Sequence, residues 1–257
     1  MSNIQFLKLT LNKKKILWNI ILPIILLVGS NLWPVNNAIC RVLMIVSAVY
    51  LLAFLCIIWV KSYKKHKRIT IFIVIIILVF FAYMSIGSLF EDEATTLELR
   101  KNYIQELKHY EGVRYVWGGE NMLGMDCSGL PRKALRNALL KTAFTNGNGK
   151  YLRYAIKTWW LDASAEALAN GYQHYVTTDG TEGTVSNASE HHLSPGDLAI
   201  TEDGRHVMVF LEEDTWISAD PLQGKVIIEK PSISHNTWFE AKVKFYTWCV
   251  LIPYHDY

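Results

Sequence analysis

The first 90 of the 257 residues contain no aspartate or glutamate, although they contain ten lysines and arginines. All 23 acidic side chains therefore lie in the remaining 167 residues, together with the other 16 basic ones, which makes the formal charge of that part −7. This uneven distribution excludes one uniformly soluble domain and predicts two parts with different surroundings. The acidic part also lacks a basic stripe, which argues against nucleic-acid binding.

Cysteine is scarce, and no two of the four cysteines have the CxxC spacing of a metal knuckle or a redox pair. Cys40 and Cys56 fall within or beside long apolar runs, which leaves Cys127 and Cys249 outside them. We expect Cys249 to be a core residue, because the residues around it are typical of a strand. His191 and its neighbour His192 have no carboxylate at ligand spacing, so we predict no metal site, and no pattern in the sequence indicates a cofactor.

Three apolar runs, residues 16–33, 41–60 and 69–89, each approach the roughly twenty residues that a bilayer-spanning helix requires. Lysines cluster before the first run and between the second and third, and positively charged loops stay on the cytoplasmic side. No small-residue cleavage site follows the first run, and bulky Ile39 precedes Cys40, which argues against a cleaved or lipidated leader. We therefore predict a multi-pass anchor of three transmembrane helices in the cell membrane (1–90) and an extracytoplasmic domain (91–257).

The most informative stretch of the second part is residues 112–135, which reads as an aromatic strand, a glycine turn and a cysteine at the start of a helix. Apolar residues at helical spacing follow Cys127, so Asp126 is the expected N-cap and Cys127 falls in the first turn. Helix amides and a nearby imidazolium lower the pKa of a thiol from about 8.5, and the same amides can hold an oxyanion. A small buried cysteine without chemistry is the alternative that residue type alone favours.

Beyond residue 193 the periodicity changes to that of strands, with a turn at 194–197 and strands at 198–201 and 206–211. Alternation places His206, Met208 and Phe210 on one face. An isolated histidine in a strand is usually structural, so this pattern alone does not assign it a role.

The residues YVWGG at 115–119, DCSGL at 126–130 and PGDL at 195–198, followed by HVxVxL from His206, occur in the order found in the NlpC-type cell-wall cysteine peptidases, and the chain resembles this papain-like family. The resemblance spans roughly residues 97–250, apart from an insertion at about 142–192, and Pro131 departs from it. It implies an α+β fold in which a cysteine-bearing helix packs on an antiparallel sheet. It further implies Cys127 as nucleophile, His206 as base, and peptidoglycan stem peptides as substrate, commonly cut after γ-D-glutamate.

The third catalytic residue is open between Asp220 and Ser218, because many relatives carry a histidine where this chain has Ser218. We choose Asp220, since a carboxylate orients and stabilises an imidazolium better than a hydroxyl does. The resemblance also implies substrate contacts from the positions of Tyr115, Asp126 and Ser128. Two alternatives remain: an amidase or acyltransferase acting on another amide, and a wall-binding scaffold without catalysis.

Overall fold

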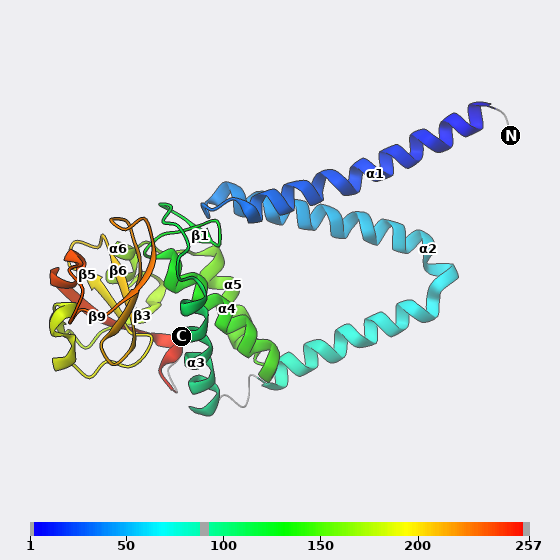
Figure 1. Cartoon of the computed structure of the whole chain (residues 1–257). Coiled ribbons are helices and arrows are strands. Elements are labelled where there is room, and N and C mark those ends of the chain that lie inside the picture. Colours follow the sequence, from blue (N-terminus) through cyan, green and yellow to red (C-terminus); the bar gives the residue numbers. More distant parts are fainter. Residues whose placement is uncertain (1–2, 88–92, 254–257) are drawn as a thin grey trace. The chain divides into compact units, whose positions relative to one another are not determined.

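The computed structural model describes the backbone of residues 3–87 and 93–253 (Figure 1). The chain divides into two compact units, Met1–Leu78 and Val79–Tyr257.

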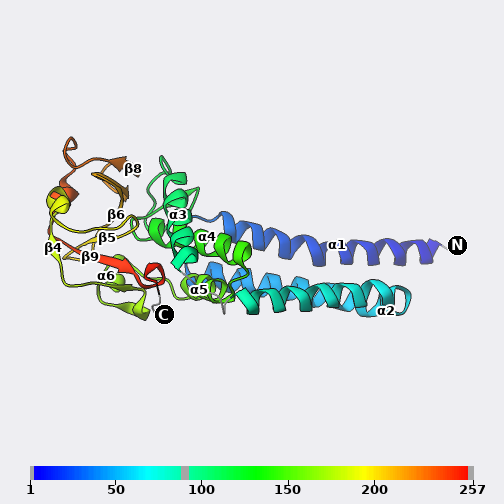
Figure 2. The same ribbon diagram turned by 90° about the horizontal axis from the view of Figure 1, so that it is seen from below.

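The first unit contains helix α1 (Asn3–Leu32) and most of helix α2 (Ala38–Gly87). Helix α2 runs without interruption through residues 61–68, so the predicted loop between the second and third apolar runs is wrong. The reason is local, since α2 has no proline and no glycine before Gly87, and lysine is a good helix former. The ribbon of α2 bends near its middle in both views (Figures 1 and 2).

Two segments of α2 are long and apolar enough to cross a bilayer, Ala38–Ile57 and Arg68–Ser85. In α1, Leu17–Leu32 is an apolar helix of less than spanning length. Among the described residues, two rather than the predicted three segments therefore reach that length, and the end of the third predicted run, residues 88–89, lies outside them. Large apolar side chains are exposed along these segments, for example Phe72 (64%) and Leu52 (64%).

The second unit combines helices with an antiparallel sheet, as the sequence predicts. Strands of the sheet follow the order β3-β9-β5-β6-β7-β8, with β4 also paired to β9, and every pairing is antiparallel. The elements are α3 (Glu93–His109), β1 (Glu120–Asn121), β2 (Gly124–Met125), α4 (Gly129–Asn146), α5 (Gly149–Trp160), α6 (Ala165–Ala169), η1 (Tyr172–His174), β3 (Val176–Thr177), β4 (Glu182–Gly183), η2 (Val185–Glu190), β5 (Leu198–Thr201), β6 (Val207–Glu212), β7 (Thr215–Asp220), β8 (Lys225–Glu229), η3 (Thr237–Glu240), β9 (Val243–Trp248) and η4 (Cys249–Leu251).

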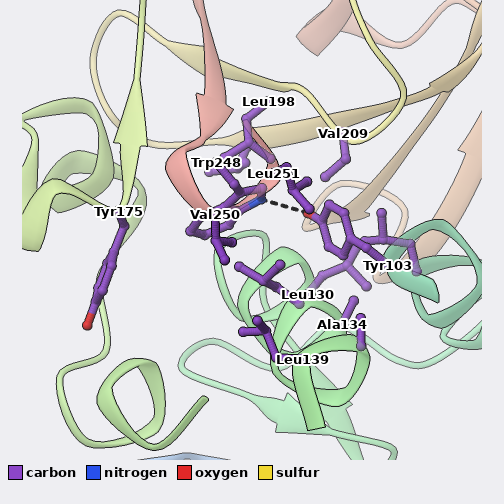
Figure 3. Packing of buried hydrophobic residues seen from close by; sticks show 14 of the residues in the cluster. Tyr103, Leu130, Ala134, Leu139, Tyr175, Leu198, Val209, Trp248, Val250 and Leu251 are labelled. Carbon is purple, nitrogen blue, oxygen red and sulfur yellow. Dashed lines mark hydrogen bonds between the residues drawn. The ribbon is translucent and has the colours of Figure 1, made fainter. Parts of the chain in front are cut away.

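The main core lies between the helices and one face of the sheet. Side chains from α3, α4 and the end of β9 meet there, and the indole Nε1 of Trp248 donates to the Tyr103 hydroxyl at 3.0 Å (Figure 3). A smaller apolar cluster, which includes Met208, Trp216 and Phe245, covers the other face of the sheet. The free thiol of Cys249 is buried beside these elements, in agreement with its predicted core position.

Three local predictions differ from the structure. The strand expected at 113–117 is reduced to single bridges, one from Arg114 to Lys225 and one from Tyr115 to Met125. The sequence pattern of residues 151–170 predicts one helical region, which the structure divides into α5 and α6, because Ser164 starts a new helix by accepting from the Ala167 N–H. The pattern of residues 238–251 predicts the last strands of the sheet, but Trp238 lies in η3.

Candidate active site

Cys127 lies just before α4, not in its first turn. The helix begins at Gly129, with Ser128 as N-cap, and the carboxylate of Asp126 reaches forward to accept from the Gly129 N–H. Its other oxygen accepts from the Gly118 N–H at 2.8 Å. The prediction of Asp126 as the N-cap residue is therefore wrong, although its carboxylate still accepts from the first helical N–H. Asp126 also connects the glycine turn to the start of α4, and Cys127 lies in the link between them.

The thiol of Cys127 faces the main chain on both sides of His206. Its Sγ donates to the carbonyl oxygen of Arg205 at 3.6 Å, and the backbone N–H of Val207 also faces the sulfur. Two segments separated by 78 residues thus meet at the sulfur. His206 directly precedes β6 rather than opening it, and the fold brings this segment to the link that carries Cys127.

The side chain of His206 is fully buried under an aromatic ring. The indole of Trp238 stacks on the imidazole with a centroid distance of 4.4 Å and an interplanar angle of 22°. Within the described part of the chain, neither ring nitrogen of His206 has a hydrogen-bond partner, and the same is true of Trp238 Nε1. The thiol lies against the main chain beside His206, and in this arrangement it donates to the Arg205 carbonyl instead of to a ring nitrogen.

Both groups are neutral in this state. Burial, followed by the nearby charge of Asp126, raises the pKa of the Cys127 thiol to about 12, although backbone N–H groups of Val207 and Ser128 act in the opposite direction. Burial also lowers the pKa of His206 to about 4. The expected lowering of the cysteine pKa is therefore absent, because desolvation outweighs the amides. A neutral imidazole can still accept the thiol proton once the two atoms meet.

The register of the sheet distinguishes the two candidates for the third residue. Val209 of β6 pairs with Ile217 of β7, and continuing this register places His206 opposite Asp220 on the same face. Ser218 then lies opposite Met208. The charge of Asp220 also acts on the imidazole, since it raises the pKa of His206 against the larger effect of burial.

Asp220 is held firmly but does not bond to the imidazole. Its Oδ1 accepts from the N–H groups of Leu222 and Gln223, at 2.6 and 3.1 Å, and its Oδ2 accepts from Asn236 Nδ2 at 2.7 Å. Asn236 belongs to the segment that also carries Trp238. One loop between β8 and β9 therefore contacts both the candidate base and its candidate partner.

The three expected substrate-contacting positions lie around the thiol. Ser128 donates to the Asp126 carboxylate at 3.1 Å, and both residues are buried. Tyr115 is half-buried, and its pKa is raised to about 12 by burial and then by its neighbours Cys127, Asp126 and Asp220. The phenol therefore shares one neighbourhood with the thiol and with both carboxylates.

A buried ion cluster supports the same region. Arg132 Nε donates to the Ser128 carbonyl at 3.1 Å, and its guanidinium lies 3.2 Å from Glu120 Oε1. Arg136, one turn further along α4, forms 3.0 Å contacts with both oxygens of Glu120. The cluster thus joins the glycine turn to the start of α4, directly beside Cys127.

Sequence reasoning missed Trp238, Asn236 and this ion cluster. For Trp238 and Asn236 the sequence offers no signal, since η3 and its N-cap Asn236 belong to the connection between β8 and β9, whose position depends on the fold. For the cluster a signal exists: Arg132 and Arg136 stand one turn apart on a helix side whose other residues are apolar, and such charges need a partner when buried.

A cavity of about 640 Å³ lies elsewhere in the domain. Its lining includes Arg100, His191, Asp197 and Thr247, but neither Cys127 nor His206. Asp197 lies directly before β5, next to this cavity. His206 lies at the other end of that strand, where its N–H donates to Thr201 Oγ1. A smaller cavity of about 400 Å³ is lined by residues that include Trp238, Asp203 and Thr201.

Residues 112–246, more than half of the chain, match the sequence model of the NlpC/P60 family. The chain belongs to the NlpC/P60 family. The match includes Cys127 and His206, which the motifs indicated, and it confirms the resemblance inferred from the sequence. Members of the NlpC/P60 family are cysteine peptidases and related hydrolases, and no curated protein sequence matches this chain.

Solved structures with similarity to this NlpC/P60 chain include three named hydrolase-family proteins. The NlpC/p60 domain of the peptidoglycan hydrolase SagA is 22% identical, with a TM-score of 0.33, over 58% of this chain and 97% of that one. The peptidoglycan hydrolase RipB from Mycobacterium tuberculosis is 20% identical, with a TM-score of 0.35, over 59% and 66%. NlpC1 from Trichomonas vaginalis is 16% identical, with a TM-score of 0.36, over 58% and 44%. The chain thus spans 44% to 97% of these structures.

The buried imidazole predicts an acid-sensitive fold. Because the pKa of His206 falls from about 6.5 in the unfolded chain to about 4 in the folded one, the unfolded chain takes up the proton first as the pH decreases. The neutral, buried imidazole makes its full contribution to the free energy of unfolding above pH 6.5. About 3 kcal/mol of that free energy is lost as the pH falls from 6.5 through 4. The measurement is the melting temperature of the full chain in detergent at pH 7 and pH 4.5.

His206→Gln should remove this part of the pH dependence, whereas His192→Gln, at an exposed position, should leave it unchanged. Equal pH dependence in all three proteins would contradict the prediction.

Proposed function

We propose that this protein is a membrane-anchored cysteine hydrolase that cleaves amide bonds in peptidoglycan stem peptides. The observation that carries the proposal is the meeting of the Cys127 thiol with the main chain around His206, inside a chain of the NlpC/P60 family. Two segments of α2 with spanning length support a membrane anchor in residues 1–90. A third crossing by the first apolar run, and with it a domain of residues 91–257 outside the cell, are part of the proposal and rest on the sequence pattern.

The chemistry follows from the residues at the site. Cys127 Sγ attacks the carbonyl carbon of the scissile amide while His206 takes the thiol proton, and backbone N–H groups at the start of α4 stabilise the oxyanion. The imidazolium then returns the proton to the leaving amine. The C–N bond breaks, a thioester of Cys127 remains, and water hydrolyses that thioester. Before the first step, the thiol has to break its bond to the Arg205 carbonyl and donate to a ring nitrogen of His206. Because the Trp238 ring stacks on that imidazole, the loop that carries Trp238 must move when substrate binds.

Specificity for the bond after γ-D-glutamate is part of the proposal, with Tyr115, Asp126 and Ser128 lining the cleft. The two carboxylates Asp126 and Asp220 near Tyr115 favour a substrate with a free amino group at this end. The elements between residues 142 and 192 form an insertion that covers one side of the domain.

The full chain in detergent, incubated with purified muropeptides and analysed by mass spectrometry, tests this function. New peptide fragments support hydrolysis after the glutamyl residue when their masses correspond to that bond. A mass change without cleavage would favour the amidase or acyltransferase alternative, and binding without any mass change would favour a scaffold.

Replacing each of the two candidates for the third catalytic residue in turn should have different effects on kcat. Asp220→Asn keeps an oxygen that can accept from Leu222 and Gln223, but it removes the negative charge that stabilises the imidazolium. The new amide nitrogen faces Asn236 Nδ2, which is also a donor, so the melting temperature should decrease. At temperatures where the variant is folded, we expect kcat to decrease by about 100-fold or more, whereas Ser218→Ala should change kcat less than about threefold. Rates of muropeptide cleavage measure both variants, and a larger loss in Ser218→Ala would transfer the role to Ser218.

A further inference from the structure

Helix α5 presents basic and aromatic side chains on its exposed side. Lys150, Arg153, Ile156 and Trp160 are exposed and lie three or four positions apart, which puts them on one face of the helix. The opposite face, which includes Tyr151 and Thr158, is buried in the domain. Ile156 is 55% exposed and Trp160 is 47% exposed, which is high for side chains of this size.

The sequence around this helix is basic, unlike the rest of the domain. Residues 127–161 contain no aspartate or glutamate but seven of the 16 basic residues of the second part, whose formal charge is −7. Of these seven, Arg132 and Arg136 are buried against Glu120, whereas Lys150 and Arg153 are exposed. The remainder of that part therefore carries a formal charge of −14. A partner that meets α5 is accordingly expected to be anionic.

Helix α5 starts where the last apolar segment ends. The Tyr83 hydroxyl donates to the Thr145 carbonyl at 2.9 Å, and Phe80 stacks on Phe144 with ring centroids 6.2 Å apart. Gly147, in the left-handed conformation (φ +64°), has no room for a side chain because the Tyr83 ring covers it. Residues 80–85, the end of the spanning-length segment that belongs to the second unit, therefore lie on the turn from which α5 begins.

We propose that the exposed face of α5 lies on the anionic lipid headgroups of the bilayer in which α2 is anchored. This inference rests on the membrane anchoring in the proposed function. A bilayer surface offers negative charge beside apolar chains, which matches a face that combines Lys150 and Arg153 with Ile156 and Trp160. Tryptophan and tyrosine also favour the headgroup region, where α5 and Tyr83 would both lie. A dissolved polyanion would satisfy the charges but not the apolar side chains.

Hydrogen exchange of the full chain in lipid nanodiscs tests this contact. One set of discs contains phosphatidylcholine alone, and a second set also contains phosphatidylglycerol. We expect the backbone amides of α5 to exchange about tenfold more slowly in the anionic discs. The double variant Lys150→Glu/Arg153→Glu should lose this difference, while exchange in α3 and the sheet stays unchanged and shows that the domain is folded.

The matched control is Lys225→Glu/Lys230→Glu, which makes the same change of charge at exposed positions on and beside β8. It should keep the slower exchange of α5 in anionic discs. Equal α5 exchange in both kinds of disc, or the same loss in the control variant, would overturn the proposal.

Two further outcomes also decide the question. If soluble poly(glycerol phosphate), added to the protein in detergent, protects α5 as strongly as the anionic discs do, the partner is a wall polymer and the lipid proposal fails. If the chain leaves the discs in high salt, the anchoring fails and this proposal with it. Muropeptide cleavage in detergent needs no bilayer, so a failure of the chemistry is recognised separately.

Discussion

Replacing Cys127 with alanine is expected to abolish muropeptide cleavage, with a loss of at least about 1000-fold. The reason is that the proposed acyl intermediate forms on this sulfur, which lies between the start of α4 and the segment of His206. Removing the buried thiol creates little space, because alanine differs from cysteine only by the sulfur atom. The folded state should therefore persist, and the melting temperature should change by only a few degrees.

Cys249→Ala is the control, because Cys249 is also a buried free thiol but lies in η4. It should cleave muropeptides at a rate within about threefold of the unchanged protein. Cleavage by the Cys127→Ala protein at more than about one tenth of the normal rate would refute a thiol nucleophile at this position. Equal losses in the two cysteine variants would show that packing, rather than nucleophilic chemistry, is responsible.

The second large effect is expected from Glu120→Ala. The side chains of Glu120, Arg132 and Arg136 are each less than 10% exposed, and Glu120 lies between the two guanidinium groups. Burial lowers the pKa of Arg132, but the charges of Glu120 and then Asp126 outweigh it, so Glu120 compensates the burial of this guanidinium. A guanidinium is not deprotonated in proteins, so removing Glu120 leaves buried charge without its partner. Leaving charges buried without their partner costs about 3–5 kcal/mol.

The expected result is a melting temperature about 10 °C lower for the full chain in detergent. Glu212→Ala is the matched control, because Glu212 pairs with Lys108 at 2.6 Å while the two side chains are 62% and 43% exposed. Such a surface pair contributes at most about 1 kcal/mol. Similar melting temperatures for both variants would mean that the buried cluster contributes no more than the exposed pair.

Glu120→Ala should also reduce cleavage at temperatures where the protein is still folded. Arg132 holds the Ser128 carbonyl, and Glu120 holds Arg132, so the cluster positions the link that carries Cys127 without touching the substrate. A lower kcat with an unchanged KM would agree with this positioning role.

The loop that carries Trp238 and Asn236 determines the resting state of the site. Stacking by Trp238 excludes water from the imidazole, and the bond from Asn236 holds the carboxylate opposite it. An unsatisfied buried nitrogen is costly, and three such atoms meet here: both ring nitrogens of His206 and the indole nitrogen of Trp238. Substrate or water that reaches them would relieve this cost, which gives the closed site a physical reason to open.

The sequence by itself determined the division into an apolar basic part and an acidic part, the α+β class with an antiparallel sheet, and the family. These features depend on local patterns: charge counts, apolar periodicity, and short motifs around Cys127 and His206. The start of α4 was predicted to within two residues because Asp126 is a strong capping residue and the apolar spacing after it is regular.

Only the tertiary structure decided the state of the site. The pKa values of Cys127 and His206 depend on burial by distant segments, so the helix amides near the thiol could not reveal that it is neutral. The pairing of β6 with β7 placed Asp220 opposite His206, and an irregular loop brought Trp238 onto the imidazole. Local patterns specify which elements form, whereas solvent exclusion and cross-strand neighbours arise only after those elements pack.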